Sequence, residues 1–217
     1  MIEIKNDCSE NNIPSELKTL ISQVIEIYKN IFGDKLVAVY IAGSIPRGNF
    51  TKGKSDADFY AVVDITRDEL HSEELRKNLA NLELSWQGKG LTTIDGEVIT
   101  TNGIHSLKKR RAAFILHTGS ILIFGRKQNF MFAVPDSSKE LATLLNGLAK
   151  KRLRKIEVRL AAGTSEAKDI NRITKLTIRC AFGVALIRGA TYSPAYKTYP
   201  AAISKYVPEL TPVINSV

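Results

Sequence analysis

The first helix of the chain is predicted by the spacing of its apolar residues. Ser15 is placed as the N-cap, because a serine side chain accepts hydrogen bonds from free backbone N–H groups. Gly33 is a natural C-terminal stop, since glycine readily adopts the backbone angles that end a helix. The apolar positions between them recur at spacings of three and four, which predicts one buried face: Leu17, Leu20, Ile21, Val24, Tyr28 and Ile31.

Three later segments have the pattern of β-strands. The apolar runs at 36–42 and 59–65 are rich in Val, Ile, Phe and Tyr, and they predict neighbouring strands. Residues 91–100 alternate in polarity, which predicts a third strand with Asp95 and Glu97 on the same face. Helices are predicted over 69–82 and 106–116, and a turn with a short strand within 116–126.

The pattern changes after residue 135. Ser137 and Glu140 have the spacing of a helix capping box, and leucines follow at helical spacing as far as Leu153. A second long helix is predicted over 169–187 and a short one over 201–206. We therefore expect an α/β (α+β) domain with a mixed sheet at 1–135, followed by an all-helical C-terminal domain at 136–217.

Composition limits the class of protein. No apolar run approaches the roughly 18 residues of a membrane span, and residues 1–10 lack the pattern of a signal peptide. The two cysteines, Cys8 and Cys180, fit neither a disulfide framework nor a metal motif. These features predict a cytoplasmic protein without a membrane partner.

The net charge of +9 is unevenly distributed. Residues 1–135 hold 17 Lys and Arg against 16 Asp and Glu, whereas residues 136–217 hold 14 against 6. The cations at 150–159 are spread around the predicted helix, so that part of them must face solvent or a cleft. The basic surplus is consistent with two interpretations: a solvated helix surface, or a surface that faces an anionic partner such as a nucleoside triphosphate or nucleic acid.

The chemistry that the sequence predicts centres on residues 39–63. Gly43-Ser44 directly follows the first apolar run, and Asp56-Ala57-Asp58 directly precedes the second. In a strand, residues i and i+2 point to the same face, so Asp56 and Asp58 present two carboxylates side by side. Such a pair repels unless a cation lies between, and Mg²⁺ is the expected cation. The backbone N–H groups of a Gly-Ser turn can contact the phosphates that Mg²⁺ accompanies.

This order of residues resembles the nucleotidyltransferase superfamily with the DNA polymerase β-like fold. The resemblance is carried by Gly43-Ser44, Arg47-Gly48 and Ser55-Asp56-Ala57-Asp58, between two predicted strands. In layout the chain is most similar to aminoglycoside adenylyltransferases. The resemblance implies an enzyme that transfers a nucleoside monophosphate, AMP from ATP in the preferred case, to a hydroxyl group.

The resemblance also implies roles for individual residues. Asp56 and Asp58 would bind Mg²⁺, two ions in the preferred case, and serve as catalytic residues. The nucleotide would be bound by Gly43, Ser44, Arg47 and Ser55, and by Lys197 in the C-terminal region.

A third carboxylate is expected on the strand at 91–100. The run Glu97-Val98-Ile99-Thr100 is similar to the Glu-Val-Thr strand of aminoglycoside adenylyltransferases, in which the glutamate is the catalytic base. Glu97 is therefore the preferred base, and Asp95 is the alternative. Both are candidate metal ligands.

The acceptor is open at this stage. The resemblance implies a small molecule with a hydroxyl group, an aminoglycoside among the candidates, but a polycation needs an acidic pocket and the helical region is basic. A local acidic patch would have to come from Glu157, Glu166 or Asp169. Transfer to RNA or to a protein hydroxyl, as in toxin–antitoxin systems, is one alternative. A regulator that binds nucleotide without catalysis is another.

Overall fold

The computed structural model describes residues 4, 6–66, 72–101, 107–130, 133–165 and 167–215. The chain divides into two compact units, Lys5–Ala133 and Val134–Val217, the second of which also includes Met1–Ile4. The boundary between the two units, after Ala133, lies two residues before the predicted one. That the units are two separately folding domains stays a prediction.

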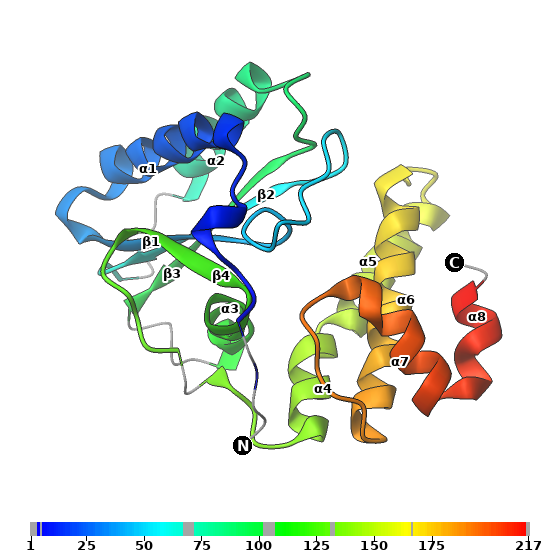
Figure 1. Cartoon of the computed structure of the whole chain (residues 1–217). Helices are drawn as coiled ribbons and strands as arrows, with labels where there is room; N and C mark the ends of the chain where they lie inside the picture. Colours follow the sequence, from blue (N-terminus) through cyan, green and yellow to red (C-terminus); the bar gives the residue numbers. More distant parts are fainter. Residues whose placement is uncertain are drawn as a thin grey trace. The chain divides into compact units, whose positions relative to one another are not determined.

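The first unit is a mixed β-sheet with helices on both faces (Figure 1). The strand order is β3-β2-β1-β4, with β1 antiparallel to β2 and β4, and β2 parallel to β3. Helices α1 and α2 cover one face and α3 the other. The elements are α1 (Lys18–Phe32), β1 (Leu36–Ala42), β2 (Ala57–Val63), α2 (Ser72–Ser85), β3 (Ile94–Thr100), α3 (Leu107–Thr118) and β4 (Ser120–Gly125).

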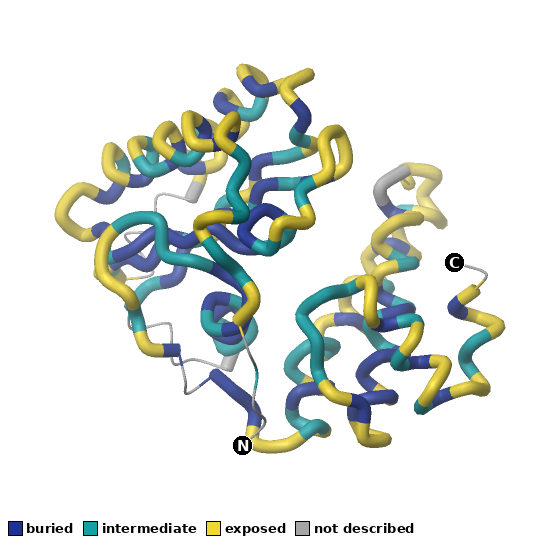
Figure 2. The backbone as a smooth tube through the Cα atoms, in the orientation of Figure 1, coloured by how far each residue is buried: buried dark blue, intermediate teal, exposed yellow. Residues whose placement is uncertain are grey.

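The two faces of the sheet follow from the alternation along its strands. Val39 and Ile41 of β1 and Phe59 of β2 belong to one group of buried apolar side chains, which also includes residues of α1 and α2. Tyr40 points to the opposite face, and its ring meets the ring of Phe130 edge-on at 5.6 Å. Figure 2 shows β1 and β2 mostly buried and one side of α1 exposed, as its predicted apolar stripe requires.

Most predicted elements of this unit are present with shifted ends. The strand predicted over 59–65 is β2, which begins at Ala57, so that Asp58 lies within the strand. Ser15 does not cap α1: it begins a separate 3₁₀ turn, Ser15–Leu17, and α1 starts at Lys18 without a side-chain cap. Gly33 ends α1 with a φ of +51°, as predicted. The predicted starts of two helices, at 69–71 and 106, lie outside the described residues.

The second unit is all-helical, which confirms the predicted fold class of a mixed sheet followed by a helical region. Ser137 caps its first helix by accepting a hydrogen bond from the Glu140 N–H, as the capping-box spacing predicts. One long helix through Leu153 is a wrong prediction, because the chain turns at Gly147 and begins a new helix at Ala149. The helices are α4 (Ser138–Asn146), α5 (Ala149–Ala161), α6 (Ala167–Ile187), α7 (Tyr199–Tyr206) and α8 (Thr211–Asn215).

Two buried aromatic rings stack between α6 and α7 of the helical unit. The Phe182 side chain of α6 is fully buried, and its ring stacks on Tyr199 of α7 with 3.8 Å between centroids. None of the described helices combines the length and the apolar character needed to cross a membrane.

Candidate active site

Three carboxylates of the first unit meet at the start of β2. Asp58 lies directly opposite Asp95 in the parallel register of β2 and β3, and Asp56 precedes Asp58 by two residues. Asp58 and Asp95 share the face that is opposite α1 and α2, and Asp56 directly precedes the strand. Each offers an oxygen, and these oxygens all lie within 4.8 Å of one another. The sheet therefore brings together residues that are up to 39 positions apart in the chain.

This cluster fits a hard divalent cation. Three ionised carboxylates so close together repel one another, and a cation among them removes the repulsion. All the donors are oxygens, which is the ligand set that Mg²⁺ prefers, and Asp56 and Asp58 are half-buried while Asp95 is exposed. The predicted Asp56 and Asp58 pair thus gains Asp95 as its third member.

The Gly-Ser turn lies against Asp58. Gly43 follows the last residue of β1, Ala42, which pairs with Asp58 in the sheet. The φ of Gly43 is +83°, a conformation that residues with a side chain rarely adopt. A Cβ at this position would also lie 2.5 Å from Asp58 Oδ2. Only a glycine allows the turn and the carboxylate to approach this closely.

Ser44 places an unpartnered hydroxyl in the same turn. Its Oγ is buried and has no hydrogen-bond partner among the described residues. The turn itself is closed by the backbone, because the Asn49 N–H donates to Ser44 O at 2.9 Å and the Gly48 N–H donates to Ile45 O at 3.0 Å. A buried polar atom without a partner is uncommon in folded proteins. Its position beside the carboxylates suits the phosphate contact predicted for Ser44.

Arg47 holds the Gly-Ser turn in the structure. Its Nη1 donates to Gly43 O at 3.2 Å and its Nε donates to Asp7 Oδ1 at 3.0 Å. The guanidinium lies over Gly119, where a Cβ would collide with it. Arg47 is thereby placed as a positioning residue for the turn, and the phosphate contact predicted for it stays a prediction.

Ser55 closes the loop that leads to β2. Its hydroxyl accepts a hydrogen bond from the Thr51 N–H at 2.8 Å, and its own N–H donates to Thr51 O at 2.9 Å. The residue is buried. The structure therefore shows a loop-closing role, and the predicted nucleotide contact of Ser55 stays a prediction.

Glu97 lies on the same face of β3 as Asp95, two residues farther along, and is not part of the carboxylate cluster. Its Oε1 forms an ion pair with Lys109 Nζ of α3 at 2.9 Å. The ion pair with Lys109 could not be predicted from the sequence motif that favours Glu97 as the third acid. The geometry places Asp95, the alternative, with Asp56 and Asp58.

Tyr60 is a neighbour that the sequence reasoning did not single out. It pairs with Glu97 in the register of β2 and β3, two residues beyond Asp58 on the same face. Burial raises the pKa of its hydroxyl, and the negative charges of Asp58 and Glu97 raise this pKa further. Its place two residues after Asp58 in a strand was the signal that could have identified it.

Four residues of the helical unit were predicted to take part in binding. Lys197 lies in a 3₁₀ turn, Tyr196–Thr198, and its side chain is exposed, so its predicted nucleotide contact stays a prediction. Asp169 is buried and bound by two arginines, which removes it from the proposed acidic patch. Glu157 is exposed, and Glu166 lies outside the described residues.

No protein-family model and no curated protein matches the chain. Among solved structures it is similar to a spectinomycin adenyltransferase, AAD(9), from Enterococcus faecialis with ATP and spectinomycin. That likeness has 15% identity and a TM-score of 0.47, and it covers 91% of this chain and 96% of the other. A toxin–antitoxin structure with AMP-PNP is also similar, with 17% identity, a TM-score of 0.38, and coverage of 64% of this chain and 98% of the other.

Structural similarities with such low sequence identities and TM-scores assign neither an activity nor a ligand to the chain. The case for function rests on the site itself: the three carboxylates, the glycine that admits Asp58, and the Ser44 hydroxyl.

Proposed function

We propose that this chain is an Mg²⁺-dependent nucleotidyltransferase that moves a nucleoside monophosphate, preferably AMP from ATP, to a hydroxyl group of a small molecule. The observation that carries the proposal is the cluster of Asp56, Asp58 and Asp95 directly beside the Gly43-Ser44 turn. A metal-binding carboxylate cluster and a phosphate-binding turn are the two parts that phosphoryl transfer needs from a protein.

Each part of the site has a separate task in this reaction. The Gly43-Ser44 turn binds the triphosphate through backbone N–H groups and the Ser44 hydroxyl. Asp56, Asp58 and Asp95 would hold Mg²⁺, which would neutralise negative charge on the phosphates. Arg47 keeps the turn in position through Gly43 O. The acceptor oxygen forms a bond to the α-phosphorus, the bond from this phosphorus to the bridging oxygen breaks, and pyrophosphate leaves.

The acceptor hydroxyl must also lose its proton. Glu97 is the preferred base, because it lies on the same face as the cluster without being one of its members. A carboxylate at this position takes the proton if the hydroxyl comes within hydrogen-bond distance. We assign Asp95 to metal binding and Glu97 to proton transfer, which separates the two roles that the sequence left open.

The charge of the chain favours an acceptor that is not a polycation. Residues 136–217 carry an excess of eight positive charges, and Asp169, one of the few acids there, is buried in an ion-pair network. A chain with a net charge of +9 disfavours the approach of a polycation such as an aminoglycoside. A neutral or anionic small molecule is the acceptor class that we propose.

The direct test is incubation with labelled ATP, GTP, CTP or UTP, Mg²⁺ and pools of hydroxyl-bearing small molecules, with pyrophosphate release as the readout. We expect release with one nucleotide above the others, and loss of release in Asp58→Asn. Nucleotide binding is measured separately, with and without Mg²⁺, and is expected to weaken in the same variant. The matched control is Asp34→Asn. It removes one exposed carboxylate of the same unit that is not a member of the cluster.

The remaining outcomes separate the alternatives. Label transferred to RNA or to a protein, with none on small molecules, would contradict the proposed acceptor class and support the toxin–antitoxin alternative. Mg²⁺-dependent nucleotide binding without pyrophosphate release for any acceptor would indicate a non-catalytic regulator. Absence of nucleotide binding at saturating Mg²⁺ would overturn the proposal altogether.

A further inference from the structure

The helical unit contains a pocket between α5 and α6 that the proposed reaction does not use. Its volume is about 420 Å³. Each helix contributes four residues at the same spacing of three, four and seven, which places one stripe of each helix along the pocket. The eight lining residues are Arg152, Lys155, Ile156 and Arg159 of α5, and Arg172, Lys175, Leu176 and Arg179 of α6.

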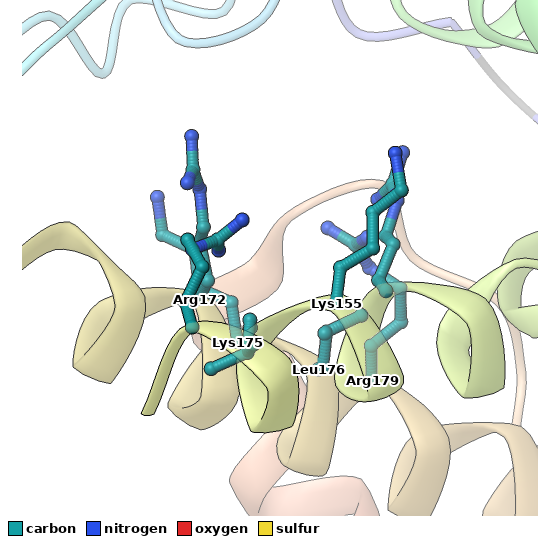
Figure 3. A pocket seen from close by; sticks show the side chains of 8 residues that line it. Lys155, Arg172, Lys175, Leu176 and Arg179 are labelled. Carbon is teal, nitrogen blue, oxygen red and sulfur yellow. The ribbon is translucent and has the colours of Figure 1, made fainter. Parts of the chain in front are cut away.

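Six of the eight lining residues are cationic and none is acidic. The sequence predicts cations all around α5, and three of them lie in the one stripe that lines the pocket. Figure 3 shows Arg172 and Lys175 on one side of the pocket and Lys155 and Arg179 on the other. The long side chains in this view carry their nitrogen atoms away from the two helices, toward the same side.

A buried carboxylate behind the lining orients part of this charge. Asp169 is 2% exposed, and its two oxygens accept hydrogen bonds from Arg159 Nε at 3.0 Å and Nη2 at 2.5 Å. Arg172 Nη1 donates to the same carboxylate at 3.2 Å. A guanidinium bound in this two-point manner is held in one orientation. The pocket is thus a built feature, with two of its arginines positioned from behind.

The other four cations are not neutralised in this way by the described residues. Within the part of the chain that the structure describes, no ion pair joins Arg152, Lys155, Lys175 or Arg179 to a carboxylate. Like charges around one pocket repel each other and destabilise the compact state. An anion with several charges relieves this repulsion, and arginine matches the geometry of phosphate oxygens especially well.

The pocket also has an apolar wall, and its size is that of a small-molecule site. Ile156 is 2% exposed and Leu176 is 6% exposed, so both are packed between the helices at the base of the stripe. Ligand pockets have volumes of roughly 300–1,000 Å³, a range that includes this one. Cations on two sides and apolar groups between the helices suit a carbon skeleton that carries phosphates at more than one position.

We propose that the pocket between α5 and α6 binds a small organic molecule with two or more phosphate groups. The proposal does not depend on nucleotidyl transfer, because all eight lining residues belong to the helical unit and the carboxylate cluster belongs to the other.

The test is a calorimetric titration of the full-length chain with fructose bisphosphate, inositol hexakisphosphate and inorganic phosphate, in EDTA at physiological ionic strength. Without a divalent cation, the carboxylate cluster repels phosphates, so that binding in EDTA reports on the basic pocket. We expect both organic phosphates to bind and inorganic phosphate to bind at least about tenfold more weakly, since it makes fewer charge-assisted hydrogen bonds.

The pocket is then tested with the double variant Lys155→Ala/Lys175→Ala, in which both side chains are exposed and line the pocket. The matched control is Lys150→Ala/Lys151→Ala, which removes the same charge from exposed positions of α5 that do not line it. We expect the pocket variant to weaken binding by about tenfold or more, and the control to change it less than about twofold.

An equal loss in the two double variants would show attraction to net charge alone and would overturn the proposal. So would binding of single-stranded RNA with no binding of either organic phosphate, and so would the absence of any binding. Unchanged helix content by circular dichroism establishes that each variant is folded.

Discussion

Asp58 occupies space that a side chain at position 43 would need. A Cβ added to Gly43 would lie 2.5 Å from Asp58 Oδ2, which is shorter than non-bonded contacts of a Cβ atom allow, so the turn or the carboxylate must move. In Gly43→Ala we expect a loss of stability of about 1–2 kcal/mol from the positive φ. We also expect a fall of about a hundredfold in kcat/KM from displacement of the carboxylate.

The control for this prediction is Gly88→Ala. Gly88 has a φ of +77° and open space where its Cβ would lie, so the substitution brings backbone strain without a collision. Thermal unfolding and pyrophosphate release are measured for both variants. Equal rates of pyrophosphate release in the two variants would show that the close approach of Gly43 and Asp58 does not contribute to activity.

Asp95 and Glu97 are expected to differ in which measurement they change. Asp95 is a member of the carboxylate cluster, so Asp95→Asn should weaken Mg²⁺ activation and lower the rate. Glu97 pairs with Lys109 outside the cluster, so Glu97→Gln should lower kcat by about 10²–10⁴ while the Mg²⁺ dependence is kept. Titration of the initial rate with Mg²⁺ separates the two, and the reverse result would exchange the assigned roles.

At the scale of elements, α5 and α6 are joined by Asp169 and its two arginines. Hydrogen bonds from Arg159, and secondarily from Arg172, hold the pKa of Asp169 below its ordinary value of 3.8. A carboxyl with a lowered pKa in the folded state stabilises the fold at every pH above its ordinary value, and this contribution disappears as the pH falls through the lower, folded value.

We therefore expect Asp169→Asn to destabilise the helical unit at pH 7, and the difference from the unaltered chain to shrink below about pH 3.8. Urea unfolding followed by circular dichroism at a series of pH values measures this difference. Glu157→Gln, an exposed carboxylate on α5, is the control and should have little effect. A difference that stays constant with pH would show that the ion pairs do not contribute.

The whole molecule is expected to unfold in two steps, because its units have separate buried groups. The single tryptophan, Trp86, lies in the unit Lys5–Ala133, so its fluorescence follows that unit alone. Phe182 is fully buried in the helical unit. We expect Phe182→Ala to remove about 3–5 kcal/mol from the transition seen by circular dichroism, and to leave the Trp86 transition in place. One shared transition that shifts for both probes would contradict separate folding.

The elements of both units were largely predictable, because they depend on local patterns. The strand Leu36–Ala42 and the helix end at Gly33 follow from an apolar run and a glycine. The break at Gly147 was missed because the leucines on either side keep helical spacing, and a pattern of apolar residues does not detect one turn between two helices.

The candidate site was predictable in part. The sequence by itself determined the Asp56 and Asp58 pair and the Gly-Ser turn, because residues two apart in a strand share a face and glycine has its own conformational freedom. Only the tertiary structure decided that Asp95 joins the pair, since this depends on the register between β2 and β3. It also showed that the side chains of Arg47 and Ser55 form hydrogen bonds with the backbone of Gly43 and Thr51, respectively.

The same division holds for the basic surplus. The excess charge of residues 136–217 is a property of the sequence, but its gathering into one pocket depends on which stripe of α5 faces which stripe of α6. The periodicity of apolar residues predicts which side of a single helix or strand is buried. Which residues of two elements meet is determined by packing and strand pairing between distant segments, and these contacts leave no local pattern in the chain.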